Sequence, residues 1–211
     1  KVGNAEALAY SDQMVRDNLI QSATWYHSEA QKIRNEALVL EDANMMTQAM
    51  DRYAIASKGY RDFLERYPND KDFYQWNFYY AECLYYSGQH LLAYEQYRVV
   101  REMDVTNNEY QETAGFNSVK ALELELASQI EKGKLPRKVL PRIADARDTA
   151  ESQESARSEE ELEASDQRKV FKPKPIPPVV MKYVTAMDRY VVLGLQNPDD
   201  KYLDAKFGFQ G

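Results

Sequence analysis

The sequence predicts an all-α fold, an α-solenoid of antiparallel helix pairs, because one short helical pattern recurs along the chain. A small residue is followed by Tyr four residues later, by a large apolar residue three later, and by Pro five later. The pattern occurs as Ala56, Tyr60, Phe63 and Pro68, as Ala186, Tyr190, Leu193 and Pro198, and, without the Pro, as Ala93, Tyr97 and Val100. Positions i, i+4 and i+7 lie on one face of a helix, and Pro ends the helix soon afterwards. A helix with one such stripe cannot bury it alone, so we expect the copies to stack.

The composition excludes several classes of function. The net charge of −7 over 211 residues argues against nonspecific binding of nucleic acid, because phosphate contacts need clustered Lys and Arg. The apolar runs are only a few residues long, so no transmembrane segment is predicted. The single cysteine, Cys83, cannot form an internal disulfide, and we expect a small buried thiol there. The 16 tyrosines suit both half-buried helix faces and binding surfaces, because the Tyr ring is apolar and its tip is polar.

Two helical segments come before Pro68. Residues 5–40 read as one or two helices, with Ser11 or Asp12 as a candidate cap of a helix start. An amphipathic stripe with helical spacing runs along this segment, at Ala23, Tyr26, Ala30, Ile33 and Ala37. Residues 45–67 form the next helix, which Pro68 ends.

The best-formed unit is a helix, a turn and a second helix. Residues 73–87 and 90–104 are the two helices, and Gly88 lies in the turn between them. Apolar positions on the inner face of the first helix are Tyr80, Ala81 and Leu84. This unit resembles the tetratricopeptide (TPR) repeat, which is about 34 residues long and carries a small residue, an aromatic residue and a Pro in its second helix. The chain departs from the family at Asn77, where the family has Trp and Trp76 is one residue away, and in the 37 residues from Ala56 to Ala93.

The remaining chain divides into a helix, an insertion and a resumed repeat. Residues 109–131 form a long helix that includes Leu122–Leu126, despite their strand-like alternation, and stops at Lys132–Gly133. Residues 145–169 hold nine acidic residues and a single Leu, and a Pro-rich stretch follows at 171–178. Such a composition cannot bury enough apolar surface to order itself, and Pro favours an extended spacer. We therefore divide the chain into helices and repeats at 1–135, an acidic and Pro-rich insertion or linker at 136–178, and a resumed repeat at 179–211. That last repeat stops inside a helix that starts near Lys201, so we expect further repeats in the natural protein.

No catalytic or metal-binding constellation is present in the sequence. The two histidines, His27 and His90, are 63 residues apart, and neither has a second ligand at metal-binding spacing. The eight glycines are scattered singly, so there is no phosphate-binding loop. We expect no enzymatic activity, no metal and no cofactor.

The resemblance to TPR proteins implies where a partner would bind. In that family the first helix of each unit lines a groove that receives a peptide or a partner helix. Carried onto the best-matching unit, the groove positions are Gln75, Phe78, Glu82, Tyr85 and Tyr86. Aromatic residues beside a carboxylate suit an extended or helical segment. The alternative for Tyr85 and Tyr86 is that they pack against the neighbouring unit.

The favoured function is a non-catalytic scaffold that binds a protein or peptide partner. The segments 60–70 and 80–88 resemble repeats in envelope proteins of Gram-negative bacteria, which include outer-membrane assembly lipoproteins, cell-division coordinators and gliding-motility scaffolds. That resemblance implies a periplasmic or outer-membrane-associated protein, attached through its partners or a removed N-terminus, with a cytoplasmic location as the alternative. The alternative function is a regulatory or substrate-recruiting domain of a larger enzyme whose catalytic part lies outside this chain.

Overall fold

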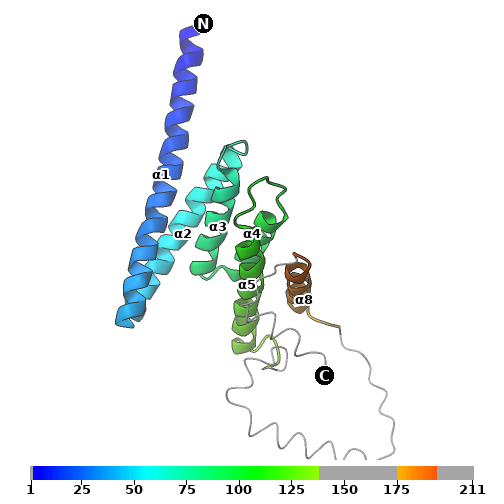
Figure 1. The fold of residues 1–211 in the computed structure, drawn as a ribbon. Coiled ribbons are helices and arrows are strands. Elements are labelled where there is room, and N and C mark those ends of the chain that lie inside the picture. Colours follow the sequence, from blue (N-terminus) through cyan, green and yellow to red (C-terminus); the bar gives the residue numbers. More distant parts are fainter. Residues whose placement is uncertain (1, 138–174, 194–211) are drawn as a thin grey trace, which may run out of the picture.

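The computed structural model describes residues 2–137 and 175–193, and these residues form helices and loops with no strand (Figure 1). The helices are α1 (Val2–Leu40), α2 (Ala43–Arg66), α3 (Phe73–Tyr86), α4 (His90–Glu102), α5 (Gln111–Glu131) and α8 (Pro178–Val192). The prediction of an all-α chain is confirmed for this part. The interpretation of residues 136–178 as an insertion, and the helix expected near Lys201, lie almost wholly outside the described residues.

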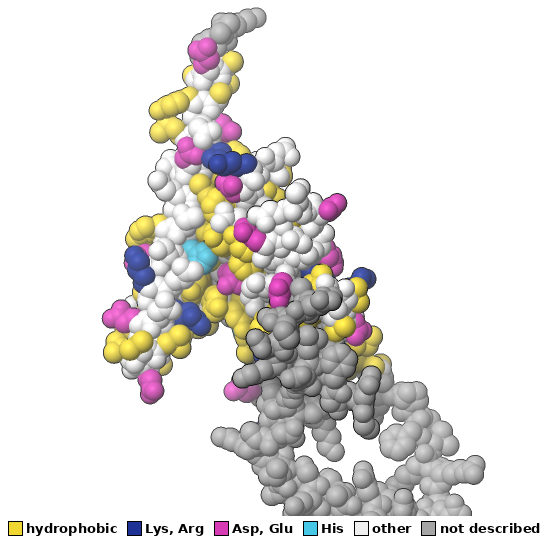
Figure 2. All heavy atoms as spheres, viewed as in Figure 1, with side chains coloured by type: hydrophobic (Ala, Val, Ile, Leu, Met, Phe, Trp, Pro, Cys, Tyr) yellow, Lys and Arg dark blue, Asp and Glu magenta, His cyan; other side chains and the backbone are white. Residues whose placement is uncertain are grey.

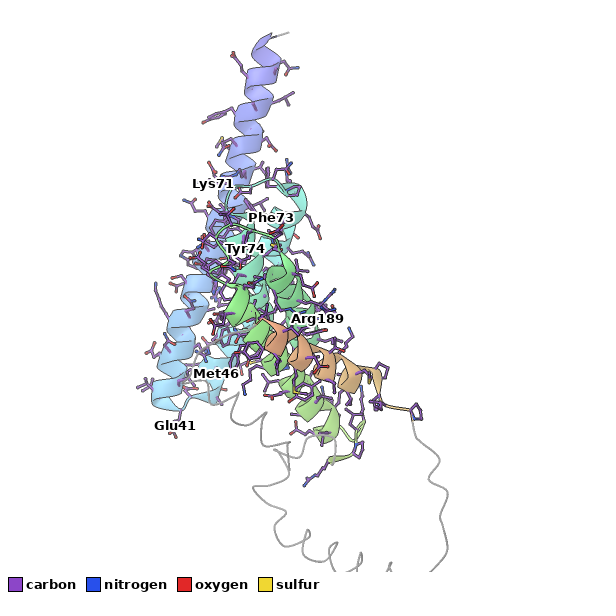
Figure 3. The ribbon with its side chains drawn as sticks, turned by 45° about the vertical axis from the view of Figure 1, so that its right-hand side comes forward. Glu41, Met46, Lys71, Phe73, Tyr74 and Arg189 are labelled. Carbon is purple, nitrogen blue, oxygen red and sulfur yellow. The ribbon has the colours of Figure 1, made fainter. Side chains whose placement is uncertain are left out.

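Each helix packs on its neighbour in the chain, and α8 packs on α5 (Figure 1). The connections alternate between the two ends of the array. In Figure 3, Glu41 marks the turn from α1 to α2 at one end, and Lys71 and Phe73 mark the turn from α2 to α3 at the other. Consecutive helices from α1 to α5 therefore run antiparallel. None of the helices in the described ranges combines the length and apolarity needed to cross a membrane.

The first helix differs from its prediction. A start near Ser11 or Asp12 is wrong, because α1 is one continuous helix of 39 residues that begins at Val2. No Pro interrupts this stretch, so nothing in its backbone requires a break. The Asp12 carboxylate instead accepts hydrogen bonds from Arg66 (3.0 Å) and from the Tyr67 hydroxyl (3.2 Å), which tie α1 to the end of α2.

The turns have identifiable causes. Gly88, between α3 and α4, has φ +79°, and Gly133, after α5, has φ +68°, which are left-handed conformations that favour Gly. Glu41 takes a similar conformation, with φ 54°, although it has a side chain. Asp42 then caps α2, because its carboxylate accepts hydrogen bonds from the backbone N–H groups of Asn44 and Met45.

The recurring Ala and Tyr positions lie in the core. Ala56, Ala93 and Ala186 are at most 1% exposed, and Tyr60 and Tyr97 are fully buried. A core alanine lets two helices approach closely, and the ring four residues later fills the space beside it. Two further predictions are confirmed: Cys83 is buried, and the segment Leu122–Leu126 lies within helix α5.

Candidate functional site

One row of side chains on α3 lies between α1 and α5. The row is Gln75, Tyr79, Glu82 and Tyr86, and its spacing of four, three and four residues places it on one face of the helix. Figure 2 shows hydrophobic side chains gathered between α1 and the helices that follow it in the array. We call the following set the central face: Gln75, Tyr79, Glu82 and Tyr86 of α3, His27 and Arg34 of α1, and Asn117 of α5. All of these residues except the buried His27 are half-buried, so they are both held in place and open to contact.

Glu82 is the polar centre of the face. Its Oε1 atom accepts hydrogen bonds from the Tyr97 hydroxyl of α4 and from Asn117 Nδ2 of α5 at 3.0 Å. Burial raises the pKa of Glu82, while the two hydrogen bonds and the positive charge of Arg34 act in the opposite direction. The carboxylate therefore joins three helices, but its environment disfavours the charge that it carries.

Arg34 supplies the positive charge of the face. The guanidinium carbon lies 4.5 Å from the centre of the Tyr86 ring, a cation–π contact. Arg34 forms no ion pair with any residue of the described ranges. The other neighbours of Tyr86 are aromatic, with the Tyr53 ring at 5.2 Å and the Tyr85 ring at 5.1 Å between centroids. A guanidinium held on tyrosine rings thus forms one end of the face.

His27 and Tyr79 form the middle of the boundary with α1. The imidazole lies 5.5 Å from the Tyr79 ring in an edge-to-face arrangement, and it also contacts the rings of Tyr53 and Tyr60. Its Nδ1 atom lies 3.2 Å from the Tyr60 hydroxyl, and its Nε2 atom lies 3.2 Å from Gln31 Nε2. Burial among these groups lowers the pKa of His27 to about 4, so the ring is neutral near pH 7.

Gln75 closes the opposite end of the face. Its side-chain amide donates hydrogen bonds to the hydroxyls of Tyr79 (2.9 Å) and Tyr110 (3.3 Å), which links α3 to the start of α5. Burial raises the pKa of Tyr110 to about 12. Tyr110 is therefore a neutral group near pH 7 that can donate or accept a hydrogen bond.

The structure separates the five predicted groove residues into two sets. Gln75, Glu82 and Tyr86 belong to the central face. Phe78 is only 8% exposed, and its ring stacks on that of Tyr110 with the centroids 4.4 Å apart, so Phe78 lies in the core rather than on an open face. The Tyr85 ring packs toward α4, against His90 and Tyr97. Its hydroxyl has a raised pKa, chiefly because of burial.

Sequence reasoning missed four residues of the face. Tyr79 shares the helical spacing of Gln75, Glu82 and Tyr86, so that signal was present in the sequence. His27, Arg34 and Asn117 come from other helices, and no local pattern marks them. Only the order in which α1 to α5 pack brings these side chains to α3.

The face lacks groups suited to covalent or metal chemistry. Cys83 lies one residue from Glu82, but its side chain is buried on the α1–α2 side, and burial raises the pKa of the thiol well above its ordinary value. Within residues 2–137 and 175–193, no group of three or more His, Cys, Asp or Glu side chains could hold a metal ion. What the face offers is aromatic surface with hydrogen-bonding and charged groups, which is the chemistry of recognition.

Comparison with known proteins gives no relative for this chain. No protein-family model matches it, and no curated protein or solved structure matches it significantly.

Proposed function

We propose that the chain is a non-catalytic scaffold that binds a protein segment on the central face. The observation that carries this proposal is the half-buried row of Tyr79, Glu82 and Tyr86 on α3. Aromatic side chains of this kind contribute large contact areas with little loss of conformational entropy, and they are enriched where proteins bind one another. The central face around this row is built by three helices at once, which is how a packed array of helices makes a continuous binding surface.

The setting of this function follows from the sequence resemblance alone. We place the chain among TPR-like solenoids, in a bacterial envelope-associated complex in the periplasm or at the outer membrane. The support is the recurring Ala–Tyr pattern and the similarity of residues 60–70 and 80–88 to envelope repeats. The consecutive antiparallel packing of α1 to α5 agrees with such a solenoid and is also found in other helical folds.

The test compares two tyrosine truncations of the whole chain. Tyr86→Ala removes a ring of the central face, and Tyr67→Ala removes a half-buried ring from the turn after α2. Partners captured by the wild-type chain are purified, and their affinities for all three proteins are measured by calorimetry. We expect Tyr86→Ala to weaken binding by about tenfold or more, because buried interface aromatics often contribute that much, and Tyr67→Ala to leave it unchanged.

Thermal midpoints of the variants serve as the folding control. A partner that binds Tyr86→Ala as tightly as the wild type, while that variant keeps its fold, would show that the central face is not the binding surface. Loss of binding in Tyr67→Ala alone would show that the partner binds near the turn after α2, beside α1, and not at the central face.

A further inference from the structure

We propose that the bound segment carries a Lys or Arg side chain, which lies between the rings of Tyr79 and Tyr86 and pairs with the carboxylate of Glu82. This inference rests on the proposed function, because it names the chemistry of the partner for the same face. Three features of the face carry it: the unused oxygen of Glu82, the tyrosines on either side, and the distribution of charge.

The first feature is the unequal use of the two carboxylate oxygens. Both hydrogen bonds of Glu82, from Tyr97 and Asn117, go to Oε1. Oε2 has no hydrogen-bond partner, yet it is not among the fully buried unpaired atoms of the described residues. This oxygen therefore keeps some exposure to solvent. An ionised carboxylate in such a half-buried position is stabilised most by a cation that donates a hydrogen bond to it.

The second feature is the pair of rings beside that oxygen. Tyr79 is three residues before Glu82 and Tyr86 is four residues after it, so the two tyrosines flank Glu82 along one face of α3, each about one helical turn away. Lys and Arg side chains place their apolar stems along aromatic surface while their charged heads reach a polar group. The ring of Tyr86 makes such a contact within the protein, with the guanidinium of Arg34, so a cation from the partner would compete with Arg34 for this ring.

The third feature is charge. Arg34 does not reach Glu82 as an ion pair, so the carboxylate lacks a direct counterion within the described part of the chain. Burial also raises the pKa of Glu82, which means that its charge is kept at a cost to the free protein. The net charge of −7 attracts a basic segment and repels an acidic one during approach. A cationic side chain from the partner would recover that cost when it binds.

The probe is a library of synthetic peptides in which each position is fixed in turn as each amino acid, tested against the 211-residue chain. We expect the wild type to select Lys or Arg at one position of the bound peptides. Glu82→Gln should remove that selection and weaken the best peptide by about tenfold or more, because a buried carboxylate–cation pair loses that much when one charge is removed. Glu65→Gln makes the same change in net charge at a side chain that is 72% exposed on α2, and it should bind as the wild type does.

A second variant separates a cationic from an anionic partner. Arg34→Gln should increase the affinity of the basic peptide, because it removes a competing positive charge from the ring of Tyr86. Selection of Asp or Glu, together with loss of binding in Arg34→Gln, would overturn the inference and keep the central face as the site. Peptides that need Tyr86 for binding but show no preference for basic residues would also overturn the inference and keep the central face as the site. If no peptide bound at all, or if Glu65→Gln lost as much affinity as Glu82→Gln, the inference would be wrong for this face.

Discussion

At the scale of single residues, the molecule places ionisable groups where their charges are disfavoured. His27 lies among three tyrosine rings at the junction of α1, α2 and α3. Glu82 lies where α3, α4 and α5 meet. The two groups have opposite consequences for the pH dependence of stability, because burial lowers the pKa of a base and raises that of an acid.

His27 should make the protein less stable in mild acid. Its pKa falls from 6.5 to about 4 on folding, so the unfolded chain binds the proton first as the pH decreases. The contribution of the neutral His27 to the free energy of unfolding is therefore complete above pH 6.5. As the pH falls from 6.5 to about 4, the free energy of unfolding decreases by about 3 kcal/mol in total. The free energy of unfolding can be measured by urea unfolding at several pH values across this range. Its slope against pH should be much shallower in His27→Gln than in the wild type. His90 has a smaller shift of the same sign, so His90→Gln should keep most of the slope. Equal slopes in His27→Gln and the wild type would show that the imidazole is not buried as described.

Glu82→Gln should stabilise the free protein near pH 7. The folded state raises the pKa of Glu82 above its ordinary 4.5, so the carboxylate lowers stability once the pH rises through the folded value, and acid removes that penalty. The Gln oxygen can still accept from Tyr97 and Asn117 without a charge to desolvate. We expect an increase in the free energy of unfolding on the order of 1 kcal/mol at pH 7, and little difference at pH 4. A decrease at pH 7 would mean that the charge itself stabilises the fold.

At the scale of helices, most boundaries could be predicted from the sequence because the residues that set them are local. Pro68, Gly88 and Gly133 each impose a backbone conformation that ends or turns a helix, and the structure places a helix end within two residues of each. The start of α1 could not be predicted in this way. Ser11 and Asp12 have the chemistry of caps, but Asp12 is used in a contact with α2 that only the tertiary structure creates.

The same contrast holds for the candidate site. The resemblance to the TPR repeat points to Gln75, Glu82 and Tyr86, and the helical spacing of these three residues includes Tyr79 as well. Phe78 could not be told apart from them, because its burial depends on Tyr110, which is 32 residues further along the chain. Arg34 and Asn117 reach the face through the packing of separate helices, which leaves no trace in the local sequence.

The turn between α1 and α2 offers a stabilising substitution. Glu41 has φ 54°, a conformation that costs a residue with a side chain about 1 kcal/mol or more relative to Gly. Glu41→Gly should therefore raise the free energy of unfolding by about 1 kcal/mol. The matched control is Glu36→Gly, within α1 at an exposed position, which should lower it by a similar amount because Gly is unfavourable inside a helix. Denaturant unfolding at one pH measures both. Destabilisation by both substitutions would indicate that the Glu41 side chain makes a contact worth more than the strain.

The close contacts of α4 should not tolerate a larger side chain at Ala93. This residue is fully buried within a cluster that includes Tyr97 and Leu122. Ala93→Leu adds volume that the neighbouring helices must move to accommodate, so we expect a loss of about 1–3 kcal/mol in the free energy of unfolding. Val99→Leu at an exposed position of α4 serves as the control and should change stability by less than about 0.5 kcal/mol. Wild-type stability of Ala93→Leu would be inconsistent with the packing of α4 described above.

At the scale of the whole molecule, the central face exists only because consecutive helices pack in order. His27 and Arg34 are brought to α3 by the α1–α2 pair, and Asn117 is brought there by the α4–α5 pair. A partner that bridges these groups would contact α1, α3 and α5 at once. Its binding should therefore stabilise the array as a unit, as any ligand of the folded state does by mass action.

The most direct measurement of the binding claim is site-specific photocrosslinking in cells that express the whole protein. Benzoylphenylalanine replaces Gln75 on the central face in one variant and Glu65 on the outer side of α2 in another, and the thermal midpoint confirms that each is folded. Because a segment bound to the central face lies against position 75, we predict a crosslinked partner from position 75 and none from position 65. Mass spectrometry then locates the crosslinked segment in the partner. Crosslinking from position 65 with none from position 75 would contradict the assignment of the α1–α3–α5 face as the binding surface.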